Sequence, residues 1–104
     1  MGSLNIDIRS HVRHNTPLHI AAWHGKCKSA AYLIRKGCNI NAKMVNGGTP
    51  LHRAALNGKT EVIVLLLDNG ADINAVDNLE RTPISCAKQS HHWSSYNLLL
   101  SRKT

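Results

Sequence analysis

The chain repeats one short phrase at a fixed spacing. Thr-Pro-Leu-His begins at Thr16 and again at Thr49, and a weakened copy, Thr-Pro-Ile-Ser, begins at Thr82. Successive copies are 33 residues apart, with no insertion between them. A fixed period of this length is typical of architectures in which small units stack and each unit is covered only by its neighbours. We therefore expect residues 1–104 to form a single domain, with repeats at about 10–42, 43–75 and 76–104.

The second copy carries start and stop signals for two short helices. Asn46-Gly47-Gly48 predicts a tight turn, since glycine accepts a positive φ at no steric cost. Thr49 stands where a helix N-cap belongs, followed by proline at the first helical position. Gly58 predicts the end of this helix, and a second one is expected from about Thr60 until Gly70 closes it. The nearly all-apolar strip of this second helix has to be covered by neighbouring repeats on both sides.

The outer copies depart from this pattern. His14 and Glu80 stand where the second copy has Gly47, and His91 stands where it has Gly58. Ser85 replaces the histidine of the repeated phrase. These departures predict a more loosely held third repeat.

The phrases Gly47-x-Thr-Pro-Leu-His-x-Ala-Ala-x-x-Gly58 and Leu65-Leu-Leu-x-x-Gly-Ala-Asp-Ile-Asn-Ala75 resemble the ankyrin repeat, and the resemblance covers about residues 10–104. It implies an all-α repeat solenoid, in which stacked ankyrin helix-turn-helix pairs are joined by β-hairpin loops. The first helix of each pair and the loop tips would line a concave side. The resemblance also implies that His19 and His52, with their threonines, bond to backbone and tie one repeat to the next.

The charge of the chain is concentrated near its N-terminus. The net charge is +7, of which residues 1–43 carry +6, seven basic residues against Asp7 alone. Such an asymmetry steers acidic partners over about 8 Å at physiological salt. The apolar run 62–67 is too short to span a membrane, and the N-terminus lacks a signal-peptide pattern. We expect a soluble, intracellular protein, cytoplasmic or nuclear. Residues 1–3, Met-Gly-Ser, are compatible with a cloning remnant, in which case the chain is a fragment of a larger protein.

Cysteine and histidine spacing argues against a metal site. Three widely spaced cysteines indicate neither a disulfide framework nor paired zinc ligands, and they favour a reducing compartment. His91 and His92 are adjacent, so on a helix they point about 100° apart. His11 and His14 could share a face but lack a third ligand nearby. We expect no metal and no cofactor.

Catalytic motifs are also missing. There is no phosphate-binding glycine loop, no Gly-x-Ser-x-Gly and no carboxylate pair outside loops. The chain is therefore predicted not to be an enzyme.

The candidate contact residues come from the resemblance, which implies that partners touch the loop tip and the end of the first helix of each repeat. Trp23 is our first anchor, with Arg13 and Arg81 beside it, because Trp and Arg dominate interface energies. The opposing interpretation is that Trp23 packs under a loop or against a neighbouring repeat. The partner-binding set comprises Arg13, Asn15, Trp23, His24, Lys43, Val45, Asn46, Leu56, Asn57, Asn78, Leu79, Arg81 and Gln89.

Three functional hypotheses remain. The leading one is a noncatalytic protein-protein interaction module, monomeric, that grips a partner protein or peptide on its concave face along an apolar thread of Trp23, Leu56 and Leu79. The alternative is binding of an anionic ligand, a nucleic acid or a phosphorylated molecule, through the basic N-terminal half. In the third, the chain is the targeting fragment of a larger adaptor, enzyme or effector.

Overall fold

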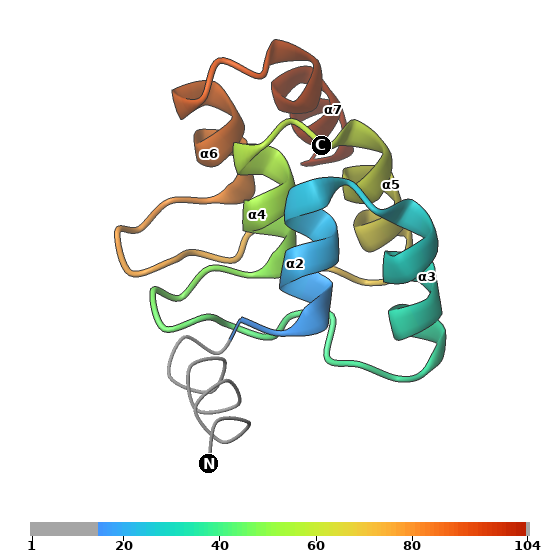
Figure 1. The fold of residues 1–104 in the computed structure, drawn as a ribbon. Coiled ribbons are helices and arrows are strands. Elements are labelled where there is room, and N and C mark those ends of the chain that lie inside the picture. The colour runs from blue at the N-terminus through green and yellow to red at the C-terminus, as the bar shows by residue number, and fades with distance from the viewer. Residues whose placement is uncertain (1–14, 104) are drawn as a thin grey trace.

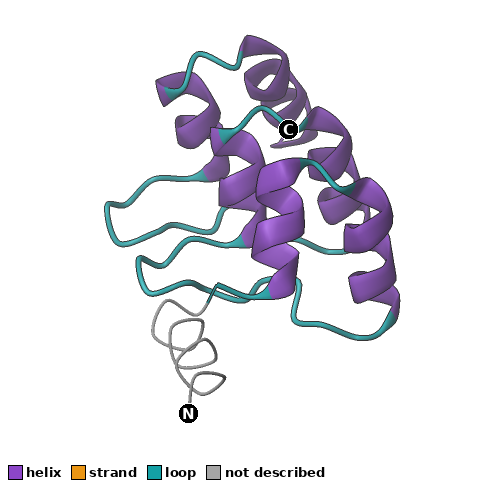
Figure 2. Ribbon diagram, viewed as in Figure 1, coloured by secondary structure: helices purple, strands orange, loops and turns teal. Residues whose placement is uncertain are grey.

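The structure is a computed structural model that describes residues 15–103. The described chain consists of helices and connecting loops, and the helices follow one another as three consecutive pairs (Figure 2). This confirms the all-helical repeat class. The predicted contact residue Arg13 and the histidines His11 and His14 lie outside the described residues. The helices are α2 (Pro17–His24), α3 (Cys27–Arg35), α4 (Pro50–Leu56), α5 (Thr60–Asp68), α6 (Pro83–Gln89) and α7 (Trp93–Lys103).

The helices form two rows. The first helices of the pairs, α2, α4 and α6, lie side by side, and the second helices, α3, α5 and α7, form the other row (Figure 1). Each helix therefore contacts its partner within the pair and its counterpart in the next pair. The loops between pairs extend from the end of the first row where its helices begin (Figure 1).

The repeated threonines begin the first helices as the sequence predicts. The hydroxyls of Thr16, Thr49 and Thr82 each accept a hydrogen bond from the backbone N–H three residues later, at 3.2–3.3 Å. A proline follows each of them at the first helical position, where its missing N–H costs nothing. Each helix of the first row thus begins at an equivalent threonine cap.

Two buried histidines tie each repeat to the next. Nε2 of His19 donates to the carbonyl of Gly48 at 2.9 Å, and Nε2 of His52 donates to the carbonyl of Arg81 at 2.7 Å. The other ring nitrogen, Nδ1, then accepts from the threonine of the same cap. Both rings are completely or almost completely buried. The ties implied by the resemblance are confirmed. Among the residues that the structure describes, the hydroxyl of Ser85, at the third position, bonds only to Thr82 in its own cap.

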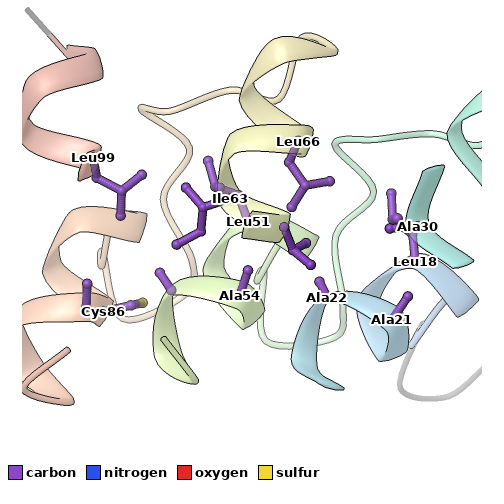
Figure 3. Close-up of a cluster of buried hydrophobic side chains, with 13 residues drawn as sticks. Leu18, Ala21, Ala22, Ala30, Leu51, Ala54, Ile63, Leu66, Cys86 and Leu99 are labelled. Carbon is purple, nitrogen blue, oxygen red and sulfur yellow. The ribbon is translucent and has the colours of Figure 1, made fainter. Parts of the chain in front are cut away.

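The core is built from small and branched residues on both rows, because Leu18 and Leu51 on the first row and Ala30 on the second row are also buried. Ala22 and Ala54 on the first row are fully buried, as are Ile63, Leu66 and Leu99 on the second row (Figure 3). Alanine lets neighbouring helix backbones approach closely, so the leucine and isoleucine side chains fill the space between the rows. The described part of the chain spans 48 × 29 × 19 Å, which makes it an elongated stack.

The expected β-hairpins are not confirmed. Between residues 15 and 103 no strand is present, and the loops at 43–48 and 76–81 are closed by tight turns. The reason is that side chains take the donors that a strand ladder would use. The Oδ1 of Asn46 accepts from the N–H of Gly48 at 2.9 Å, and the Oδ1 of Asp77 accepts from two backbone N–H groups at 2.9 Å.

The same turn position is left-handed in two consecutive loops. Gly47 has φ +83°, and Glu80, 33 residues later, has φ +62°. A non-glycine residue pays about 1–2 kcal/mol for this conformation. His91 also has φ +62°, at the helix break where Gly58 has φ +67°. The third repeat therefore carries backbone strain that the second repeat avoids.

Candidate functional site

Five predicted contact residues gather where the first-row helices end, and we call them the helix-end strip. Trp23, Leu56 and Gln89 occupy the same position in the last turn of α2, α4 and α6. Trp23 and Leu56 are half-buried, whereas Gln89 is exposed. Because equivalent helices lie side by side, these positions form a short band across the row. His24 and Asn57, which follow Trp23 and Leu56 in the chain, complete the strip.

An arginine that the sequence did not single out covers the tryptophan. The guanidinium carbon of Arg53 lies 4.2 Å from the centroid of the Trp23 ring, which is cation–π distance. Burial lowers the pKa of Arg53 from its ordinary value. In addition, the side-chain N–H of Asn57 donates to the carbonyl of Trp23 at 2.7 Å. Trp23 is thus held by α4. It packs against the neighbouring repeat and is also partly exposed at the surface.

Helical spacing offered a weak signal for this stack. Arg53 precedes Leu56 by three residues on α4, which places the two on one helix face. The same position in the other repeats holds Ile20 and Cys86, so a basic residue there is particular to the second repeat.

Arg81 does not lie against Trp23 but along its own repeat. Its Nε bonds to the carboxylate of Asp77 at 2.8 Å, and its Nη1 donates to Gln89 at 3.1 Å. Burial alone would raise the pKa of Asp77, but hydrogen bonds from the Arg81 backbone and side chain and from the Leu79 backbone lower it overall. This charged pair therefore joins the loop before α6 to the end of that helix.

The remaining predicted residues form a second group, the loop tips. Lys43, Val45, Asn46, Asn78 and Leu79 are all exposed, and Leu79 is the most exposed large apolar residue described, at 72%. The two loops are stacked, because Asn78 donates its backbone N–H to the carbonyl of Asn46 at 2.8 Å and its side-chain N–H to that of Val45 at 3.0 Å.

The two groups lie at opposite ends of the first row. The helices of this row have 7 or 8 residues, so their ends are about 10–12 Å apart at a rise of 1.5 Å per residue. Leu79 belongs to the loop before α6, whereas Leu56 is the last residue of α4. Half-buried Asn15 lies at the beginning, just before α2. The expected thread from Trp23 through Leu56 to Leu79 is therefore interrupted along the helix axis.

One cluster of potential metal ligands lies in the described part of the chain. Donor atoms of His52, Asp77 and Cys86 are all within 4.8 Å of one another, and all three residues are buried. Both ring nitrogens of the histidine and both carboxylate oxygens already have hydrogen-bond partners. Burial raises the pKa of the Cys86 thiol to about 11, so this group is protonated at neutral pH. The arrangement suits a structural network between two repeats better than an ion site.

All the described cations of the N-terminal half except Lys43 line one helix. Lys26, Lys28, Arg35 and Lys36 lie on or directly beside α3, and all four are exposed. Among the described residues, no helix is both long and apolar enough to cross a membrane.

A comparison with protein-family models matches residues 18–104 to the family described as ankyrin repeats, in three copies. A search of curated proteins found no match.

Proposed function

The chain belongs to the ankyrin-repeat family, and from this premise we propose that it is a noncatalytic interaction module that binds a partner protein across its first-row helices. Ankyrin repeats generally mediate protein–protein interaction. The helix-end strip is the central part of the proposed contact surface, with the loop tips as a second contact along the same side.

The observation that carries the proposal is the stack of Arg53 on Trp23. Tryptophan and arginine are the residue types that most often dominate binding energies, and here they form one preassembled pair next to Leu56. Since α2 and α4 already hold the pair, a partner would pay little entropy to order it. Truncation of a central anchor of this kind typically costs about 2 kcal/mol or more.

The test is a pull-down from cell extract with the wild-type and Trp23→Ala chains at low and high salt, with identification of retained protein and nucleic acid. We expect a protein that resists salt and is lost with Trp23→Ala. Trp93→Ala is the matched control, because Trp93 is the other tryptophan of the chain, lies on α7 and is 49% exposed. It should retain the partner.

A second variant separates loss of binding from loss of folding. Gln89 is an exposed member of the helix-end strip, so Gln89→Trp adds bulk there without entering the core. Circular dichroism monitors the fold of all variants. Full retention of the partner by folded Trp23→Ala and folded Gln89→Trp would refute the proposal.

The second candidate function is binding of an anionic ligand, such as a nucleic acid or a phosphorylated molecule, and the exposed cations on α3 favour it. Binding of duplex DNA through phosphates would weaken steeply with salt, with a log-log slope of about −0.9 for each phosphate neutralised. In the same pull-down, nucleic acid that is lost at high salt and is indifferent to Trp23→Ala would favour this function.

Either activity is compatible with a role as the targeting part of a larger adaptor, enzyme or effector. We further propose a monomeric protein with a cytoplasmic or nuclear location. The location is proposed because Cys27, Cys38 and Cys86 are free thiols, as a reducing compartment keeps them.

A further inference from the structure

A groove of about 1240 Å³ opens on the outer face of the first repeat, between α2 and α3. Its floor is apolar and is made by Pro17, Ile20, Ala21, Leu33 and the ring of Tyr32. Ile20 is 45% exposed and Tyr32 is 52% exposed. We call it the first-repeat groove. Its volume exceeds the roughly 300–1,000 Å³ of small-molecule pockets, so a polypeptide segment suits it better.

The rim of the groove is basic. Lys26 and Lys28 lie on its α3 side and Lys43 on the side of the following loop, and all three are exposed. No acidic residue is among the described residues that line it. Cations gathered around an apolar cleft focus their field and attract negative charge more strongly than isolated surface lysines do.

In the following repeats the equivalent face is covered. Cys86, which occupies in the third repeat the position of Ile20, is completely buried where α6 packs against α4. The first-repeat groove is therefore the surface that stacking covers elsewhere in the molecule.

Two of the three rim cations have no basic counterpart in the other repeats, whereas the position of Lys26 is held by Lys59 in the second repeat. The position of Lys28 is held by Glu61 and Ser94 in the other repeats, and that of Lys43 by Val76. A neutral neighbouring repeat would not need this rim. The chain's own residues 1–14 contain two arginines against one aspartate, so their charge does not complement the rim either. An occupant with acidic side chains does.

We propose that the first-repeat groove docks an acidic amphipathic helix of a partner protein. Its apolar face lies on Ile20 and Tyr32, and acidic residues along its flanks pair with Lys26, Lys28 and Lys43. An amphipathic helix that lays its apolar face into a groove is a common mode of peptide recognition. This docking surface is separate from the Trp23–Arg53 stack, since neither residue lines the groove.

Selection from a phage-displayed library of random peptides tests the proposal, with the full chain as bait. Clones retained by the wild type are re-tested on Lys26→Glu/Lys28→Glu. Both substitutions are on exposed residues at the beginning of α3, where acidic groups suit the helix dipole, so the fold should survive. Lys88→Glu/Lys103→Glu is the control, because it makes the same charge change on exposed residues of α6 and α7.

We expect the retained peptides to be acidic, with apolar residues at helical spacing, and to bind Lys26→Glu/Lys28→Glu about tenfold or more weakly. Ile20→Asp should weaken them similarly, whereas the control pair and Trp23→Ala should change affinity less than threefold. Peptides without acidic bias, or equal affinity for the groove and control variants, would overturn the proposal. So would NMR spectra in which Ile20→Asp shifts the amides of residues 1–14 while no acidic peptide binds the wild type, because the chain's own segment would then fill the groove.

Discussion

The clearest consequence of the stacked loops is that one turn position tolerates a side chain in one repeat and not in the other. A Cβ on Gly47 would lie 2.9 Å from the backbone nitrogen of Asn78 and 3.1 Å from the Cα of Asp77. Both atoms belong to the backbone of the next loop, so neither can move unless that loop moves with it. The Gly47→Ala chain must therefore strain a residue with φ +83° and also push the next loop away.

The expected cost follows from three contributions. An L-residue in the left-handed region costs about 1–2 kcal/mol. Separation of the loops loses the bond between the Asn46 carbonyl and the Asn78 N–H, which is worth about 1 kcal/mol. Overpacking adds about 1 kcal/mol, and the lower entropy of the unfolded alanine chain returns about 1 kcal/mol. We expect Gly47→Ala to lower the free energy of unfolding by about 2–3 kcal/mol.

Glu80 supplies the matched control because it occupies the same turn position 33 residues later and already has φ +62°. Within the described residues no further loop stacks on this one. Glu80→Ala should therefore change stability by less than about 0.5 kcal/mol, and Glu80→Gly should raise it by about 0.5–1 kcal/mol as the strain is relieved.

Urea denaturation followed by far-UV circular dichroism measures these differences. With a slope of about 1–3 kcal/mol per molar urea, Gly47→Ala should move the midpoint down by about 0.7–3 M, and Glu80→Ala should leave it nearly unchanged. Equal midpoints for Gly47→Ala and Glu80→Ala would refute the claim that the loops are packed backbone to backbone.

Three further predictions concern the third repeat and the buried histidines. Burial lowers the pKa of His19 and His52 below the ordinary 6.5. The unfolded chain therefore binds more protons than the folded chain once the pH falls below about 6.5. The free energy of unfolding should then fall by up to about 1.4 kcal/mol per pH unit for each ring. Thermal melts between pH 7.5 and 5 check this, and a flat profile would contradict it. Ser95 has a buried hydroxyl without a hydrogen-bond partner among the described residues, so Ser95→Ala should stabilise by about 1 kcal/mol in urea melts, and more than Ser94→Ala on the exposed side of the same helix. Amides of residues 83–100 should exchange with deuterium faster than those of 50–67, because the third repeat combines backbone strain with the missing histidine; equal protection would show that neither matters.

Features set by neighbours in the sequence could be predicted from it. The caps at Thr16, Thr49 and Thr82 depend on a residue three positions later, so local spacing was sufficient. Single glycines marked the left-handed breaks at Gly25 and Gly58, but the break at His91 is left-handed without one. The histidine ties reach 29 residues along the chain and were anticipated only through the resemblance to a known repeat.

Contacts that depend on side-chain direction could not be predicted. Whether Arg53 points to solvent or over Trp23 is decided by the distance between α2 and α4, which the spacing of residues does not reveal. The same holds for Arg81, which we expected beside Trp23 and which instead pairs with Asp77. The β-hairpins are not confirmed for a different reason: turn-forming residues were recognised, but the hydrogen bonds from backbone N–H groups to the side chains of Asn46 and Asp77 were not.

Loss of the third repeat would leave an unpaired histidine behind in the repeat that stays folded. Each ring donates to a carbonyl of the following repeat, so departure of the third repeat takes the Arg81 carbonyl from His52, while the tie of His19 to Gly48 stays closed. A ring released in acid would take up a proton, and a protonated Nδ1 can no longer accept from the threonine of its own cap. Protonation would then stabilise the frayed state, so that in acid the repeats would separate one at a time and would not re-form their histidine ties.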